Sequence, residues 1–136
     1  MRALLVALSA SAAYPGAWAT FAPRSFFTTF PGAGHHWTAA LPGYSAHLVA
    51  DVGAFYLAFA LMLGWAAARP SRELIVPVAS GFALFSALHL GWHLAHLDGF
   101  STTDAVAQTI SLAAVLVASI GAAVLATRRP RARAAS

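Results

Sequence analysis

The chain has 136 residues, of which 60% are hydrophobic and only 9% are charged, and its mean hydropathy is +0.71. This length suits one domain, and a soluble domain of that size needs far more charged surface. The sequence contains no cysteine, which excludes disulfides, thiolate catalysis and cysteine-ligated metal centres. All eight basic residues are arginine, and no basic stripe with interleaved aromatics indicates a nucleic-acid partner. We therefore predict a single integral membrane domain over residues 1–136.

Apolar residues are gathered in four stretches, at residues 3–22, 45–68, 73–97 and 102–127. Each has about 20 residues or slightly more, which matches a hydrocarbon core of about 30 Å at a rise of about 1.5 Å per residue. A segment in lipid must satisfy its own backbone polar groups, so such a stretch has to be helical. The predicted fold is an all-α membrane protein, a bundle of four transmembrane helices.

The first stretch allows two interpretations. Arg2 followed by an apolar run and by Ala10-Ser11-Ala12 also fits a signal peptide with a small-residue cleavage motif, so residues 1–19 are either a retained helix or a cleaved signal. Uncharged sequence continues to Ala22, which is long enough to span, and we favour the retained helix. Both interpretations leave Arg2 inside and the remaining topology unchanged.

The connection between the first two stretches, residues 23–44, is rich in aromatic residues rather than hydrophilic. One interpretation is a lid over a cavity among the helices. The other is an interfacial segment whose aromatic rings lie at headgroup level, and we favour this second one. The adjacent His35 and His36 do not by themselves indicate a metal site.

The arginines predict the orientation of the bundle. Arg2, Arg69, Arg72 and the basic tail at residues 128–136 belong to one side, whereas the loops on the other side carry only Arg24. Because cytoplasmic segments are enriched in basic residues, both termini are expected in the cytoplasm. The tail would then face anionic lipids of the bilayer. The arginine-only, alanine-rich composition favours a bacterial source, and hence a multi-pass protein of the bacterial inner membrane.

Polar residues recur at helical spacing on three of the predicted helices: His47 and Asp51 on the second, His89, His93 and His96 on the third, and Asp104, Gln108 and Ser111 on the fourth. Residues three or four apart share one face of a helix. Ionisable groups inside a membrane are costly unless they pair or face water. We predict a polar cluster near the outer face, centred on a pairing of Asp51 with His89 or His93 in which the carboxylate fixes the tautomer of the imidazole. His47, His96 and Gln108 would surround this centre, and Asp104 would cap the fourth helix.

Several imidazoles beside a carboxylate are suitable ligands for zinc, copper, iron or nickel. The candidate ligands of such a transition metal are His47, Asp51, His89, His93 and His96. Two histidines on facing helices could instead ligate a haem. A purely structural polar network is an equally good interpretation of the same residues. No serine-protease, P-loop, dinucleotide-binding or HExxH motif occurs in the sequence.

Three stretches carry a resemblance to a known group of proteins: Ala22–Phe27, His47–Gly53 and His89–Gly99. Together they resemble small uncharacterised bacterial four-helix membrane proteins that are loosely similar to DoxX-like proteins. The resemblance implies four helices rather than three helices and a signal peptide. It implies no substrate.

Three functions are compatible with this sequence. The first, which we favour, is a non-enzymatic subunit or scaffold, with small residues that allow close helix contact within a homo-oligomer or a larger membrane complex. The second is a metal- or haem-binding, redox-linked protein that uses the polar cluster. The third is a proton-linked carrier in which Asp51 and the histidines form a relay.

Overall fold

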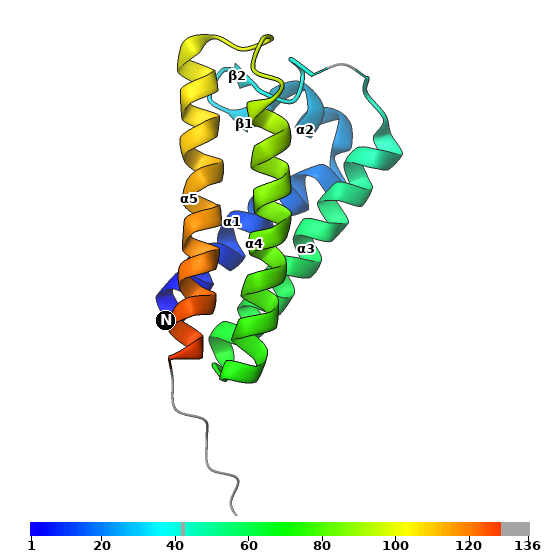
Figure 1. Cartoon of the computed structure of the whole chain (residues 1–136). Coiled ribbons are helices and arrows are strands. Elements are labelled where there is room, and N and C mark those ends of the chain that lie inside the picture. Colours follow the sequence, from blue (N-terminus) through cyan, green and yellow to red (C-terminus); the bar gives the residue numbers. More distant parts are fainter. Residues whose placement is uncertain (42, 129–136) are drawn as a thin grey trace, which may run out of the picture.

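A computed structural model describes residues 1–41 and 43–128 of the chain. Its helices are α1 (Arg2–Phe21), α2 (Pro23–Thr29), α3 (Ala46–Ala68), α4 (Arg72–Leu94) and α5 (Thr102–Thr127), and a short antiparallel hairpin joins β1 (Pro31–Gly32) to β2 (His35–His36) (Figure 1). The basic tail predicted from sequence lies outside the described residues from 129 onward.

Four of these helices, α1, α3, α4 and α5, are long and apolar enough to cross a membrane, with 20, 23, 23 and 26 residues. Large apolar side chains point outward from them. Phe55, Leu61, Leu84, Leu88 and Val117 are between 63% and 71% exposed. The most buried positions instead hold mainly small or polar side chains, including Ala66, Ala79, Ala122 and Ser119. This distribution suits a surrounding of lipid, and the predicted all-helical architecture with four helices long and apolar enough to span a membrane is confirmed.

The long connection after α1 is more ordered than the sequence indicated. Pro23 starts α2, because a proline at the first helical position loses no intrahelical hydrogen bond. The hairpin then turns through Gly32, Ala33 and Gly34, whose φ angles of 98°, 54° and 86° favour glycine. These elements fold the connection back over the end of the bundle.

The third of the long apolar helices, α4, ends at Leu94, three residues before the predicted end. Past this point Nδ1 of the His96 ring donates to the Trp92 carbonyl at 2.7 Å, so its side chain takes the acceptor that its own backbone N–H would use in a continued helix. The His96 N–H bonds to the His93 carbonyl instead, at 3.0 Å. Competition of this kind between side chain and backbone is a known way of ending helical structure.

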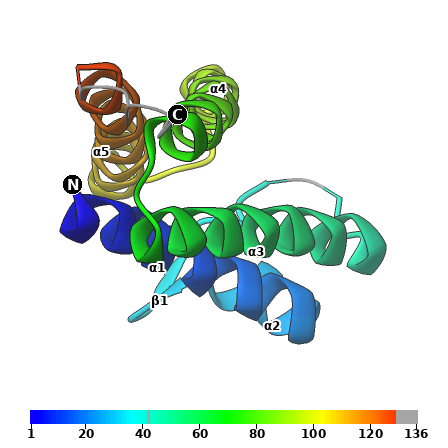
Figure 2. The same cartoon turned by 90° about the horizontal axis from the view of Figure 1, so that it is seen from below.

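The four long helices form two pairs. α1 packs along α3 and α4 packs along α5, whereas contacts between the pairs are far fewer. Seen from below, α1 and α3 lie side by side across the view while α4 and α5 are seen nearly end-on (Figure 2). The pairs therefore cross obliquely.

The two halves of the bundle differ in how they are filled. The start of α1, the α3–α4 turn and the end of α5 lie together at one end, which we call the arginine end because it carries Arg2, Arg69, Arg72 and Arg128 (Figure 1). The buried apolar core lies in this half and includes Leu5, Leu63, Ile75 and Phe82. The opposite end, which we call the loop end, carries α2, the hairpin and the α4–α5 connection.

The α1/α3 pair depends on two glycines at its crossing. A Cβ atom on Gly53 would lie 2.6 Å from the backbone nitrogen of Thr20, and one on Gly16 would lie 3.0 Å from the backbone nitrogen of Leu57. Small residues of this kind allow helix backbones in membranes to approach closely. The hydroxyl of Ser9 also donates to the Ala60 carbonyl at 2.7 Å, which adds a polar contact to the same pair.

We expect Gly53→Ala to destabilise the protein by about 1–3 kcal/mol, because the added methyl group would meet backbone that must move. The measurement is the thermal unfolding temperature of the purified protein in detergent. Gly91→Ala is the matched control, since a Cβ there meets nothing within 4 Å. Equal unfolding temperatures for the two variants would contradict the close crossing.

Candidate functional site

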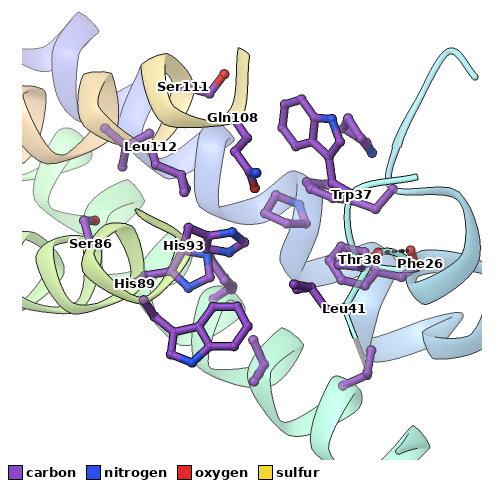
Figure 3. Close-up of a pocket in the computed structure, with 18 of the residues that line it drawn as sticks. Phe26, Trp37, Thr38, Leu41, Ser86, His89, His93, Gln108, Ser111 and Leu112 are labelled. Carbon is purple, nitrogen blue, oxygen red and sulfur yellow. Dashed lines mark hydrogen bonds between the residues drawn. The ribbon is translucent and has the colours of Figure 1, made fainter. Parts of the chain in front are cut away.

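A cavity of about 770 Å³ lies in the loop-end half of the bundle, between the two helix pairs (Figure 3). Aromatic side chains dominate its walls, with Tyr14 from α1, Phe85 and Trp92 from α4, and Phe26 and Trp37 from the loop-end connection. No aspartate, glutamate or arginine lines it among the residues that the structure describes. The described walls of the cavity are thus apolar and aromatic and carry no arginine or carboxylate side chain.

Two helices contribute the imidazole and amide side chains that line this cavity. His89 and His93 extend from α4, with ring centroids 4.6 Å apart, and Gln108 extends toward them from α5 (Figure 3). The His89 ring is stacked on Phe85, at a centroid distance of 5.6 Å and an interplanar angle of 11°. This stacking makes His89 part of the aromatic wall, while His93 and Gln108 present polar atoms.

The polar atoms of Gln108 and His93 are buried without hydrogen-bond partners. Gln108 is only 1% exposed, and neither its Oε1 nor its Nε2 has a partner in the described part of the chain. The same holds for Nδ1 of His93. A buried donor or acceptor that is left unpaired costs about 1–3 kcal/mol. Unpaired groups at the wall of a cavity are therefore available to form hydrogen bonds with a molecule inside it.

The loop-end connection covers the cavity as a lid, which we define as residues 23–41. Phe30 forms its centre, packing against Tyr14, Trp18, Phe26 and Trp37 at centroid distances of 4.6–6.2 Å. Aromatic rings of this connection, among them Phe26 and Phe30, line the cavity, as the lid interpretation expects, and the favoured interpretation of an interfacial segment at headgroup level stays a prediction.

A single carboxylate ties the lid to α5. Asp104 Oδ1 accepts hydrogen bonds from His35 Nδ1 at 2.6 Å and from Trp37 Nε1 at 2.8 Å. Its Oδ2 accepts from the Ser101 hydroxyl at 2.8 Å. Hydrogen bonds to an ionised acceptor are shorter and stronger than neutral ones. Asp104 joins β2 and the following loop to the first turn of α5, and we call this set of contacts the latch.

The predicted cap at the start of α5 is confirmed, although the cap is only part of what Asp104 does. The Ser101 hydroxyl accepts from the Asp104 backbone N–H at 3.1 Å, as expected for a serine at the N-cap. Sequence spacing reveals this local contact. The partners of the carboxylate, His35 and Trp37, are almost seventy positions away and no local signal identifies them.

The central pairing predicted from sequence is wrong. Asp51 lies on α3 with its carboxylate 3.2 Å from His47 Nε2, one turn away on the same helix, and not beside His89 or His93. The side chain of Asp51 is 53% exposed and that of His47 is 82% exposed. Helical spacing placed both residues on one face, but it could not say that this face points away from the other helix pair.

Only some of the other residues of the predicted polar cluster lie at the cavity. His89, His93 and Gln108 do come together at the cavity, whereas His96 lies beyond α4 and stacks on Trp92 at a centroid distance of 4.1 Å. Within residues 1–41 and 43–128, no three histidine or acidic side chains come close enough to hold a metal ion. The five-residue ligand set is not assembled. The two histidines that meet stand one turn apart on α4, not on facing helices as a haem would require.

Comparison with models of known families, with curated proteins and with solved structures found no match to this chain. The resemblance to DoxX-like proteins therefore receives no support. The site has to be interpreted from its own geometry.

We expect Asp104→Ala to release the lid, because it removes the acceptor of His35 and Trp37 but keeps the serine cap on the backbone. Amide hydrogen exchange across residues 31–41 should become faster, with exchange in α3 unchanged. Asp98→Ala, which removes an exposed carboxylate of the same α4–α5 connection, is the control. Unchanged protection of the lid in Asp104→Ala would show that the latch does not hold it.

Proposed function

We propose that this chain is a non-enzymatic, multi-pass membrane protein that binds a small, uncharged, lipophilic molecule in the cavity beneath the lid. The observation that carries the proposal is the cavity of about 770 Å³. Aromatic rings line it, and none of the described residues that line it is an arginine, an aspartate or a glutamate. Ligand sites of small molecules typically have volumes of about 300–1,000 Å³ and are mostly apolar, with a few placed polar groups.

The composition of the cavity supports binding rather than catalysis. A general acid or base at such a site is usually a histidine that a carboxylate orients. Here the acids of the described residues that bond to histidine, Asp51 and Asp104, lie outside the cavity wall. The same arrangement weakens the proton-relay hypothesis, because Asp51 faces outward.

Tryptophan fluorescence tests the proposal, because Trp92 lines the cavity and Trp65 does not. We expect bromobenzene, a neutral lipophilic quencher, to quench the fluorescence of the detergent-solubilised protein with a saturable component. Trp92→Phe should remove much of this component, and Trp65→Phe should leave it intact. Quenching that only rises linearly, as for free tryptophan derivatives in the same micelles, would contradict the proposed site.

The proposal includes an orientation with the lid outside the cell and both termini in the cytoplasm. Arg2, Arg69, Arg72 and Arg128 lie at the arginine end, whereas Arg24 is the basic residue of the described part at the loop end. Basic residues accumulate on the cytoplasmic side of membrane proteins, which supports this orientation in a cell membrane, and in the bacterial inner membrane if the source is bacterial.

The absence of cysteine from the sequence allows a direct test of orientation. Ala39→Cys places a single exposed thiol in the lid, and Glu73→Cys places one at the arginine end. In intact cells a membrane-impermeant maleimide should label position 39, and it should reach position 73 only after permeabilisation. The reverse pattern of labelling would overturn the orientation.

A further inference from the structure

We infer that the ligand carries an uncharged group that both donates and accepts hydrogen bonds, a hydroxyl on a lipophilic body being the simplest form, and that Gln108 and His93 bind this group. The inference rests on the proposed function and adds the chemistry of recognition to it. Gln108 is the only residue among those described that is buried at the cavity with both of its side-chain polar atoms unpartnered.

The side chain of Gln108 defines what it can bind. Its amide offers donors at Nε2 and an acceptor at Oε1, and neither atom has a partner in hydrogen-bonding geometry in the described structure. The ring of His93, opposite on α4, has an unpartnered Nδ1 that donates or accepts according to its tautomer. A group that satisfies both Gln108 and His93 must therefore both donate and accept hydrogen bonds.

Other common head groups fit this pair less well. An ether or a ketone only accepts, so it would leave Gln108 Oε1 without a donor. A carboxylate would bring a charge into a wall that has no arginine or lysine among the described residues, and a buried unpaired charge is expensive. A hydrocarbon would leave every buried polar atom unpaired. A hydroxyl donates one hydrogen bond and accepts others, which matches Gln108 and His93 together.

The position of Gln108 connects this contact with the lid. Asp104 and Gln108 are four residues apart on α5, and so lie on one helix face in successive turns. Asp104 holds the lid above the cavity, and Gln108 faces the cavity one turn deeper. The aromatic walls then surround the apolar body of the ligand, with Phe85 and Trp92 on the α4 side.

A matched series of naphthalene derivatives tests the head group, with binding measured as displacement of bromobenzene from the wild-type protein in detergent. The probes are 1-naphthol and 1-naphthamide, which donate and accept, 1-methoxynaphthalene, which only accepts, naphthalene, and the anion 1-naphthoate. We expect the first two to bind about tenfold more tightly than naphthalene and the methoxy compound, as one or two net hydrogen bonds provide, and the anion to bind weakest.

Variants then locate the contact. In Gln108→Leu, naphthalene should bind as before while the preference for 1-naphthol falls to less than about twofold, since the hydrogen bonds that give it are removed. His93→Phe should reduce the preference in part, and it serves as the second variant if Gln108→Leu does not fold. Ser119→Ala is the control, because Ser119 is equally buried on α5 but bonds to the Val115 carbonyl and lies outside the cavity.

The outcomes separate the inference from the proposed function. Saturable binding of naphthalene and 1-naphthol with equal affinity to the wild type would overturn the inference and keep the cavity as a lipophilic site. A preference for 1-naphthol that survives in both Gln108→Leu and His93→Phe would also overturn it. If none of the probes displaces bromobenzene, the proposed function itself fails.

Discussion

A shared apolar core of large and small side chains at the arginine end joins the two helix pairs, and the shape of the molecule depends on it. Ala66 and Ala67 of α3, Ala79 of α4, and Ala122 and Ala126 of α5 are buried there, which allows the helices to approach closely. Because the pairs cross obliquely, close approach at one end requires separation at the other. The cavity is that separation. A chain with larger residues at these alanines would lose the convergence of the pairs, and with it the defined opening at the loop end.

The lid, with its aromatic rings, covers the half of the bundle in which the helix pairs separate. The lid is fixed by polar contacts that are long-range in sequence: His35 and Trp37 bond to Asp104, and the Tyr14 hydroxyl donates to the Pro31 carbonyl at 3.0 Å. Thr38 also bonds back to the carbonyls of Phe26 and Phe27 (Figure 3). Beneath it, Nδ1 of His93 and both side-chain polar atoms of Gln108 have no hydrogen-bond partner in the described structure, whereas the buried Ser119 hydroxyl donates to the Val115 carbonyl on its own helix. Thr20 Oγ1, at the α1/α3 crossing, is also buried without a partner among the described residues, so what distinguishes the cavity is that three such atoms, on His93 and Gln108, lie together at its wall.

The helices could be predicted from sequence because each depends on local properties. Apolar length defined four spans, Arg69-Pro70 marked the end of α3 at Ala68, and Ser101 with Asp104 marked the start of α5. Only part of the candidate site could be predicted from the sequence. Helical spacing brought His89, His93 and Gln108 into consideration, but the direction of each face relative to the other helices depends on packing, so Asp51 and His47 were assigned inward when they point outward. His96 was assigned to the interior of the third helix, whereas α4 ends before it. Because His47, Asp51 and His96 do not reach the cavity, the predicted set of metal ligands is not assembled. The latch joins residues nearly seventy positions apart and could not be read from any local pattern.

The most direct measurement of the central claim is an experimental structure of the protein purified from its native membrane in lipid. We expect density inside the cavity for a bound molecule whose body packs against Phe85 and Trp92, with a polar atom about 3 Å from Gln108. A cavity that contains only water, or that has closed so that Gln108 bonds directly to His93, would contradict a ligand-binding role for this half of the bundle.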